Sequence, residues 1–364
     1  MCGNRDQRGS SQHGFTLIEL LVSLVVSLLI GLAAAAGAML FAAYQRQGAG
    51  TGVATLSTTN SLMAIQQDVA QAGLGFFGDS AFLCEKLNLS IGTTDLSSSA
   101  FSPLKVVHGT AFDQIDVVYA SEVVAGANVA LDSSSNGSSA QLHSYLPVSA
   151  GQAVLLAPAP PTPPAISVTG GTCTVRSVSA VATPASPAPE ILTFASAAAS
   201  QTPHNQVSFA QPVTYAANDR ASVLGTLAWN RYRVDAGGNL WMDRVLKGDS
   251  AIVLRNVVGF RVRYGVAAVG ATSVSAWTDA VDDATGQWAT LPPAALARVR
   301  AVRIGIVTSS TQPEKADANG KCSASTSLPR LFDADVSLPT GWECYRYRSA
   351  EATVPLRNLI LGLR

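Results

Sequence analysis

The first part of the chain is a short polar stretch followed by apolar residues from Phe15 to about Ala43. As a helix, these residues would extend about 43 Å at 1.5 Å per residue, which exceeds the ~30 Å hydrocarbon core of a bilayer. We therefore predict a membrane-spanning helix over residues 15–43. One acidic side chain, Glu19, lies inside this apolar run.

A second pattern, typical of an amphipathic helix, follows. Leu62, Ile65, Val69 and Ala72 recur at a spacing that places them on one helix face. Residues 44–78 are therefore predicted to form the second half of one long helix, which packs this face against a globular head. The helix is expected to end at the glycines that follow Ala72.

Three glycines interrupt the pattern between the two halves, at Gly48, Gly50 and Gly52. Each weakens helical propensity by about 1 kcal/mol relative to alanine. We expect a bend or a locally melted turn there.

Residues 79–364 show short β-branched runs between turn residues, so the head is predicted to be mainly β. Asp235-Ala236-Gly237-Gly238 separates two such runs and is a hairpin signal. The predicted strands are Ile115–Ala120, Ala153–Ala157, Cys173–Val178, Leu227–Val234, Asn239–Leu246, Phe260–Val266 and Val299–Val307.

Alternation along the last of these strands places Val302, Ile304 and Ile306 on one face. Arg303 lies on the other, so Arg298, Arg300 and Arg303 are interpreted as a solvated or interface strand face and not as an anion site.

Residues 123–218 have a different composition. They contain three charged side chains and are rich in Ala, Ser, Pro and Thr. Residues 158–164 are expected to be extended, polyproline-like chain. We interpret much of this stretch as long surface loops inserted into the head, with a ligand-presenting arm as the alternative.

The overall charge is balanced, with 24 basic and 24 acidic residues. This balance gives no electrostatic reason to expect nucleic acid as a partner. Arg5 and Arg8 precede the apolar helix, and the positive-inside rule then places the N-terminus in the cytoplasm and the head outside.

The exported head would lie in an oxidising compartment, so its cysteines are disulfide candidates. Four cysteines allow three connectivities, between which the sequence does not choose. We favour Cys84–Cys173 with Cys322–Cys344, because the second pair closes a short loop near the C-terminus. A metal site is disfavoured, since no C-x-x-C spacing or nearby histidine is present. Cys2 precedes the apolar run and is interpreted as incidental.

The sequence contains no recognisable catalytic motif. The four histidines are scattered, and the nucleophile-elbow, zinc-protease and phosphate-loop patterns are absent. Asp279, Asp282 and Asp283 lack the spacing of a known calcium loop and are interpreted as an acidic turn. We therefore predict no enzyme, no cofactor and no metal.

The N-terminal segment carries the clearest functional signal. An ionised side chain in a membrane helix costs about 2.5–3.5 kcal/mol, so Glu19 suggests a function. A secretory signal, with cleavage after Ala36, or a plain membrane anchor explains neither Glu19 nor Gly14. Gly14-Phe15-Thr16-Leu17-Ile18-Glu19 instead resembles the signal of type IV pilins and pseudopilins.

This resemblance implies that a prepilin peptidase removes residues 1–14 by cleavage between Gly14 and Phe15. It also implies that Phe15 is N-methylated and that Glu19 forms an assembly salt bridge. The corresponding fold is α+β: a long N-terminal helix, transmembrane in its first half, packed on a β-rich head with long loop insertions.

Further segments resemble the PilW family of minor pilins. They are Asp68–Gly75, Trp229–Val234, Val258–Gly265, Arg300–Val307 and Pro355–Asn358. The resemblance implies a subunit that helps initiate pilus assembly at or near the tip, in adhesive, motile fibres. Implied partners are other minor pilins, the major pilin, a PilY-type tip adhesin and the bacterial inner membrane, which residues 15–43 would span before assembly. The alternatives are a J-type pseudopilin of type II secretion and a membrane-anchored adhesin.

Overall fold

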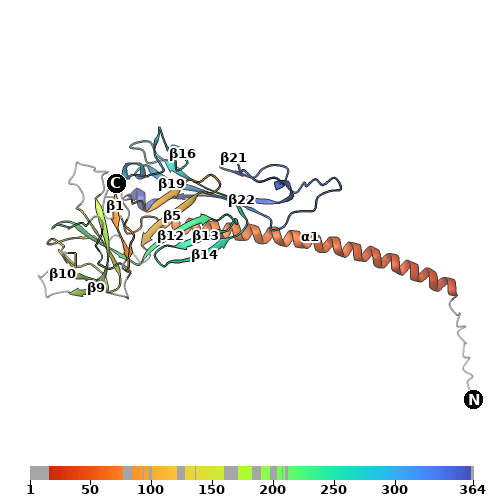
Figure 1. The fold of residues 1–364 in the computed structure, drawn as a ribbon, viewed down its shortest axis with the longest axis horizontal. Coiled ribbons are helices and arrows are strands. Elements are labelled where there is room, and N and C mark those ends of the chain that lie inside the picture. Colours follow the sequence, from red (N-terminus) through yellow and green to blue (C-terminus); the bar gives the residue numbers. More distant parts are fainter. Residues whose placement is uncertain are drawn as a thin grey trace, which may run out of the picture. The chain divides into compact units, whose positions relative to one another are not determined.

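The computed structural model describes residues 16–76, 84–92, 94–97, 101–120, 128–135, 137–159, 171–182, 190–196, 203–206, 208–209 and 212–361. The chain divides into two units, Met1–Val53 and Ala54–Arg364. Helix α1, Leu17–Gln71, belongs to both, and the second unit is rich in strands (Figure 1).

The backbone of α1 is helical through Gly48, Gly50 and Gly52. The locally melted turn expected at these glycines is therefore wrong. The cost of about 1 kcal/mol per glycine is modest, because helical residues on both sides allow propagation without a new nucleus.

In the second unit, the expected apolar face of α1 is confirmed. Leu62, Ile65, Val69 and Ala72 are all buried. Gly73 and Gly75, directly after the helix, have positive φ values of 78° and 85°. A Cβ at Gly75 would lie 2.8 Å from the Cβ of Ala120, so glycine is required there for the chain to pass close to the neighbouring strand.

A five-stranded antiparallel sheet, here the helix-side sheet, has the order β14-β13-β12-β5-β4. Its central hairpin joins β12 to β13 around Asp235–Gly238, which confirms the hairpin expected from the turn residues. The strands are β4 Leu104–Val107, β5 Gln114–Ala120, β12 Leu227–Val234, β13 Leu240–Arg244 and β14 Asp249–Leu254.

A four-stranded antiparallel sheet, here the C-terminal sheet, has the order β16-β15-β19-β22. Its two central strands carry the alternation seen in the sequence, and Val302, Ile304 and Ile306 are fully buried. The strands are β15 Val257–Val266, β16 Ala276–Thr278, β19 Val299–Ser309 and β22 Tyr347–Pro355.

A seven-stranded sheet, here the low-charge sheet, has the order β6-β11-β8-β9-β10-β7, with β1 pairing β9 in parallel. Five of these strands lie within residues 123–218, so the interpretation of much of that stretch as surface loops is wrong for the described residues. Residues 160–170, which include most of the proline-rich run, lie outside them. The strands are β1 Lys86–Asn88, β6 Asn128–Ala130, β7 Ser139–Leu142, β8 Ala153–Ala157, β9 Thr172–Ala182, β10 Glu190–Phe194 and β11 Arg220–Gly225.

Three two-stranded hairpins and three short helices complete the described fold. The hairpins are β2 Ser90–Ile91 with β3 Thr94–Asp95, β17 Asp282–Asp283 with β18 Gly286–Gln287, and β20 Arg330–Leu331 with β21 Ala334–Asp335. The helices are α2 Pro293–Leu296, the 3-10 helix Trp342–Cys344 and α3 Arg357–Leu361.

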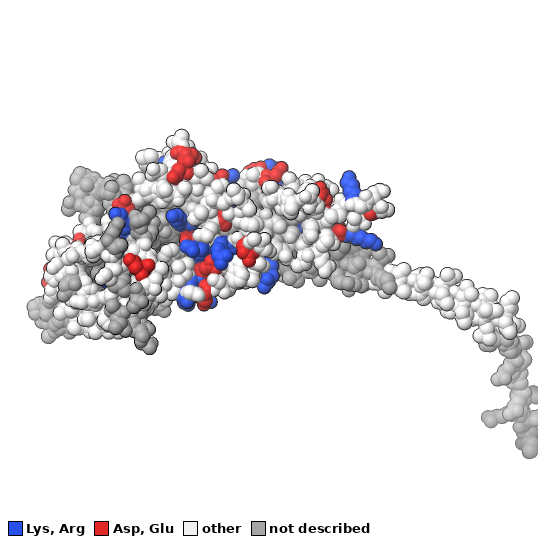
Figure 2. Space-filling model, in the orientation of Figure 1, with Lys and Arg blue, Asp and Glu red and all other residues white. Residues whose placement is uncertain are grey.

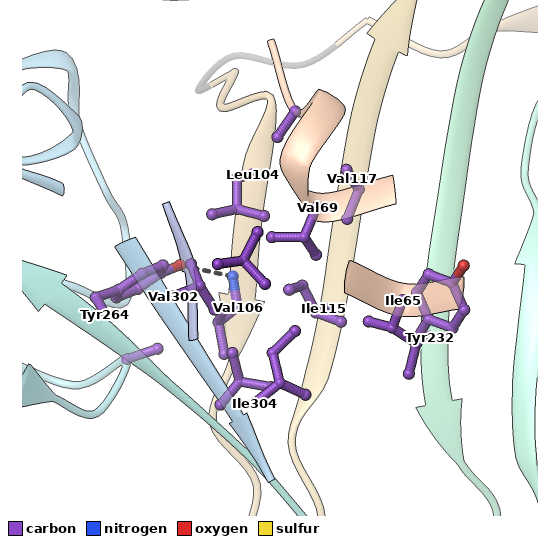
Figure 3. Packing of buried hydrophobic residues seen from close by; sticks show 14 of the residues in the cluster. Ile65, Val69, Leu104, Val106, Ile115, Val117, Tyr232, Tyr264, Val302 and Ile304 are labelled. Atoms are coloured by element: carbon purple, nitrogen blue, oxygen red, sulfur yellow. Dashed lines mark hydrogen bonds between the residues drawn. The ribbon is translucent and has the colours of Figure 1, made fainter. Parts of the chain in front are cut away.

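The main core lies where α1 meets the first two sheets. Figure 3 shows Ile65 and Val69 of α1 among residues such as Ile115 of the helix-side sheet and Ile304 of the C-terminal sheet. Tyr264 is fully buried there, and its hydroxyl accepts a hydrogen bond from the Val106 backbone N–H at 2.6 Å. The low-charge sheet has a separate apolar cluster that includes Leu142, Leu156 and Leu192. A third cluster, which includes Phe76, Leu87 and Leu155, brings residues of the helix-side and low-charge sheets together, so the described part of the head contains three apolar clusters.

Candidate functional site

The N-terminal part of α1 is the first component of the candidate site. Residues Leu17–Ala38 have a mean hydropathy of 2.6 and none of this window is buried, so the segment is long and apolar enough to cross a membrane. Ser23 and Ser27 donate their hydroxyls to the Leu20 and Leu24 carbonyls, both at 3.0 Å. These bonds satisfy the two hydroxyls within the helix, as an apolar environment requires.

Glu19 lies in the first turn of α1, exposed between apolar neighbours. Its backbone N–H donates to the Thr16 carbonyl at 3.1 Å. Its carboxylate forms no ion pair within the described part of the chain. Gly14 and Phe15 lie outside the described residues, so cleavage between them stays a prediction.

The second half of α1 is attached to the head by polar contacts as well as by its apolar face. The hydroxyls of Thr58 and Thr308 are 3.1 Å apart, and Ser61 donates to the Val253 carbonyl at 2.8 Å. Near the helix end, the Asn358 amide donates to the carbonyls of Ala70 and Ala72. Contacts from three separate parts of the sequence therefore hold the helix.

Among these polar contacts, the Asp68 carboxylate accepts the most hydrogen bonds. Its carboxylate accepts hydrogen bonds from the hydroxyls of Tyr119 at 2.8 Å and Tyr232 at 2.5 Å. The Asn230 amide donates to the same carboxylate at 2.7 Å. Three donors from β5 and β12 thus meet one acceptor on α1.

Burial raises the pKa of the Tyr119 and Tyr232 phenols, and the negative charge of Asp68 raises it further. Both phenols therefore remain protonated donors well above neutral pH. In the sequence, Asp68 stands out only as part of the segment Asp68–Gly75 that resembles the PilW family. The sequence feature that could have identified Asp68 is the position of an acidic residue next to the buried helix positions Ile65 and Val69.

Two disulfides lie in the head. Cys84 pairs with Cys173, which begins the buried part of β9, and Cys322 pairs with Cys344. These are the pairs favoured from the sequence. The first closes 89 residues of chain and the second closes 22.

The C-terminal disulfide encloses a hairpin that covers the outer face of the C-terminal sheet. Phe332, in the turn between β20 and β21, lies against the guanidinium groups of Arg263 and Arg303, at 5.4 and 4.8 Å from the ring centre. A Cβ at Gly305 would lie 2.8 Å from Leu331, so glycine leaves room for the hairpin. Gly305 and Val307 are consequently buried, although they lie opposite the main core.

Of the two alternatives for these arginines, a solvated or an interface face, the structure supports an interface within the chain, because Arg298, Arg300 and Arg303 are half-buried and bind other segments. Arg298 donates to the Ala267 and Thr285 carbonyls, and Arg300 donates to those of Ala297 and Ala271. Arg303 pairs with Glu351 at 2.6 Å. Each arginine side chain binds another segment of the chain. The alternation of apolar and polar residues along the strand does not reveal these partners.

The acidic residues considered for calcium have protein partners. Asp279 pairs with Arg263 at 2.8 Å, and Asp282 accepts the Ala289 N–H at 2.8 Å. Asp283 accepts the N–H groups of Thr285 and Gly286 within its own turn. Across the residues that the structure describes, no cluster of three or more potential metal ligands is found.

Ion pairs cross the outer face of the helix-side sheet. Arg231 pairs with Asp116 at 2.8 Å and Arg233 with Asp243 at 2.6 Å. On the opposite face of the same sheet, which also carries Asn230, Arg244 pairs with Asp249 at 2.7 Å. Figure 2 shows blue and red side chains gathered over this part of the head. The Asp116 and Asp243 carboxylates are mostly shielded from solvent, and we interpret their pairs with arginines as register-setting contacts between strands.

A cleft of about 700 Å³ lies between the loop His108–Phe112 and the segment 331–339. Its two arginines are already engaged: Arg261 pairs with the buried Asp113 at 2.9 Å, and Arg263 pairs with Asp279. The cleft therefore offers no unpaired cation for an anionic ligand.

Two family models match the chain. The model of the type IV pilus-assembly protein W, PilW, matches residues 232–358, and the prokaryotic N-terminal methylation motif matches residues 9–35. No curated protein matches. A type IV-like pilin from Thermus thermophilus is similar over 85% of this chain and 98% of its own, at 10% identity and a TM-score of 0.33. The two family models cover the segments that hold Glu19 and the C-terminal sheet.

Proposed function

Because this chain is a type IV pilin-like protein of the PilW family, with a prepilin-type N-terminal signal, we propose that it is a minor pilin that helps initiate pilus assembly at or near the tip. The observation that carries the proposal is the combination of Glu19 in an exposed apolar helix with a PilW-type region in the head. The helix would supply the assembly element, and the head would supply the surface that distinguishes this subunit from others.

We propose the following domain organisation for the precursor. Residues 1–14 are the leader, 15–43 span the inner membrane, 44–78 contain the second half of the helix, which ends at Gln71, and 79–364 form the exported head. The positive charges of Arg5 and Arg8 support a cytoplasmic N-terminus. A membrane peptidase would then cleave after Gly14 on the cytoplasmic side and leave the apolar helix in the mature protein.

Processing is tested by mass spectrometry of the full-length protein purified from membranes. We expect a mature N-terminus at Phe15 that carries one methyl group. Gly14→Ala is the matched variant, because a subsite that closes on the backbone accepts a β-carbon poorly, and we expect uncleaved precursor to accumulate. An intact leader in the unchanged protein, or a start after Ala36, would contradict the proposal.

Glu19 is proposed to guide assembly by pairing with the charged amine of Phe15 on an adjacent subunit. That amine exists only after cleavage, and a methylated secondary amine retains its charge. Inside a bundle of apolar helices the two charges attract strongly, while either one alone is costly. The pair would therefore favour docking in register with other minor pilins, a complex that the major pilin then extends.

Glu19→Gln and Glu19→Ala test this role in cells that produce pili. We expect normal membrane insertion but fewer pili, with less of this subunit in the sheared fibres. Glu19→Asp is the matched control, because it keeps the charge at a shorter reach. Wild-type incorporation and pilus numbers in both uncharged variants would show that the pairing is not used.

A tip location and a PilY-type adhesin as partner are tested by immunogold labelling of sheared pili and by affinity purification of the tagged subunit. We expect label at fibre ends and co-purification of other minor pilins. Label along the whole fibre would contradict the tip location. Co-purification with secretion components alone would favour the J-type pseudopilin.

A further inference from the structure

Strand β22 forms an open edge of the C-terminal sheet. It pairs with β19 over nine consecutive residues without a register shift, and among the described residues no other strand pairs with its outer side. Ser349, Glu351 and Thr353 are exposed along it. The strand is therefore long, regular and accessible.

The hydrogen-bond pattern shows which backbone groups face outward. Just beyond the two ends of the ladder, the Ser310 N–H donates to the Arg346 carbonyl and the Leu356 N–H donates to the Arg300 carbonyl, at 2.8 and 2.9 Å. Because backbone direction alternates along a strand, the even-numbered residues of β22 bond to β19. The N–H and C=O groups of Ser349, Glu351 and Thr353 consequently point to the open edge.

A contact on the far side of the same sheet supports this assignment. The Val262 N–H of β15 donates to the Asp113 carboxylate, away from β19, so the odd-numbered residues of β15 bond to β19. The odd-numbered residues of β19 therefore form backbone hydrogen bonds with β15, and the even-numbered residues of β19 form them with β22.

The features that normally protect an edge strand are largely missing from β22. Its register has no bulge, it contains no lysine, and its one proline, Pro355, is its last residue. Glu351 does not shield the edge, because its carboxylate is held by Arg303 and by the Phe332 N–H at 2.8 Å. An edge of this kind is a template for another strand.

We infer that the open edge of β22 binds an extended segment of a different pilus subunit by strand addition, with an acidic side chain of that segment close to Arg348. Arg348 is exposed and forms no ion pair within the described residues, so the unbalanced charge of β22 is positive. A second copy would bring the same positive charge, whereas an acidic segment complements it. The inference rests on the proposed function, because it requires incorporation into pili.

Hydrogen exchange of the unmodified protein provides the test. The full mature chain is compared in detergent and in sheared pili. We expect the amides of Ser349, Glu351 and Thr353 to exchange freely in detergent and to slow by about tenfold or more in pili. The even-numbered amides of the strand should be protected in both samples.

Equal exchange of the odd-numbered amides in both samples would overturn the inference while leaving the proposed function intact. Failure of the chain to enter pili at all would overturn the proposed function and this inference with it. If protection arises when the detergent-solubilised chain alone is concentrated, the occupant is a second copy, and the inference is wrong.

Two matched pairs of variants add an independent readout. Thr353→Pro removes an outward N–H without removing a bond to β19, whereas Thr353→Ala retains that N–H. We expect about five- to tenfold less of the proline variant in pili, with both variants equally stable in detergent. Arg348→Glu should reduce incorporation and Arg348→Lys should preserve it. Equal incorporation within both pairs would overturn the inference.

Discussion

The two sheets that contact α1 and the low-charge sheet use polar side chains in different ways. Around α1, a carboxylate such as Asp68 collects several donors, and arginines pair with acids across strands. In the low-charge sheet, the buried Arg176 has no acidic partner among the described residues. It donates to the Asn205 carbonyl at 2.7 Å and lies over the Phe209 ring.

Buried polar groups in segments next to the low-charge sheet follow the same trend. His204 is buried, which lowers its pKa, and its Nδ1 lies 2.8 Å from the Ser90 carbonyl oxygen. The Tyr215 hydroxyl lies 2.8 Å from the hydroxyl oxygen of Thr174. This difference indicates that ion pairs and charged hydrogen bonds are concentrated where the head binds α1 and the covering loops. In the low-charge sheet, backbone groups bind the buried charges: the Asn205 carbonyl accepts from Arg176, and the Leu146 N–H donates to the Glu190 carboxylate at 2.7 Å.

The largest expected effects come from removing the disulfides, one in each region. In the chain-entropy model, replacing Cys84 and Cys173 with alanine lowers the free energy of unfolding by about 4.6 kcal/mol, and replacing Cys322 and Cys344 lowers it by about 3.4 kcal/mol. The longer closed segment, 89 against 22 residues, produces the difference. Urea unfolding of the full chain in detergent measures both. A larger loss from the shorter loop would contradict the entropic account.

Asp68→Ala tests the charged region directly. The two phenols and the Asn230 amide would lose their common acceptor, at a cost of about 3 kcal/mol in the free energy of unfolding. Asp68→Asn keeps one acceptor oxygen and should cost less. Gln67→Ala, on the exposed face one residue earlier, is the matched control and should change stability by less than about 0.5 kcal/mol. Equal losses for Asp68→Ala and Gln67→Ala would reject this role for Asp68.

Arg176→Met tests the low-charge region. Methionine retains much of the apolar length, loses one hydrogen bond and removes a buried charge, whose desolvation lowers the pKa of Arg176. These effects oppose each other, so we expect a change within about 1 kcal/mol in the free energy of unfolding. A loss as large as that of Asp68→Ala, measured in the same urea titration, would erase the contrast between the regions.

The smallest expected effect is a dependence of stability on acid pH. Hydrogen bonds from the Trp241 indole and from Asn239 lower the pKa of Asp235 from 3.8 to about 2. Between these values the unfolded chain holds more protons, so this group's contribution is present above about pH 4 and is lost as the pH falls towards 2. Asp235→Asn should give a smaller slope of unfolding free energy against pH in that window. Parallel slopes would show that Asp235 does not contribute.

The parts of the fold that depend on local chemistry could be predicted from the sequence. The helix face of Leu62 and Ile65 follows a 3.6-residue period, and Asp235–Gly238 is a recognisable turn. The low-charge sheet has no comparable signal. Strands such as β6 and β7 have three or four residues, and β11 pairs with strands far earlier in the sequence. The small residues around these strands are typical of loops, so the composition predicts loops there.

The candidate site shows the same division: its local motif could be predicted from the sequence, and its long-range contacts could not. The N-terminal motif specifies Gly14, Phe15 and Glu19 within a few residues of each other. The donors around Asp68 come from strands that lie 51 to 164 residues away in the sequence. The hairpin that covers Arg303 also arrives from a separate segment. Such contacts depend on tertiary placement, which single-sequence patterns do not encode.

The two disulfides also give the head a particular topology. Each converts its stretch of chain into a closed ring, one between Cys84 and Cys173 and the other between Cys322 and Cys344. A single proteolytic cut inside either ring opens that ring but leaves both pieces covalently attached. Nicked subunits would therefore run as intact chains on non-reducing gels and as fragments only after reduction. Strands β1, β6, β7 and β8 of the low-charge sheet lie inside the first ring, so a single cut between any two of them sheds no part of the chain.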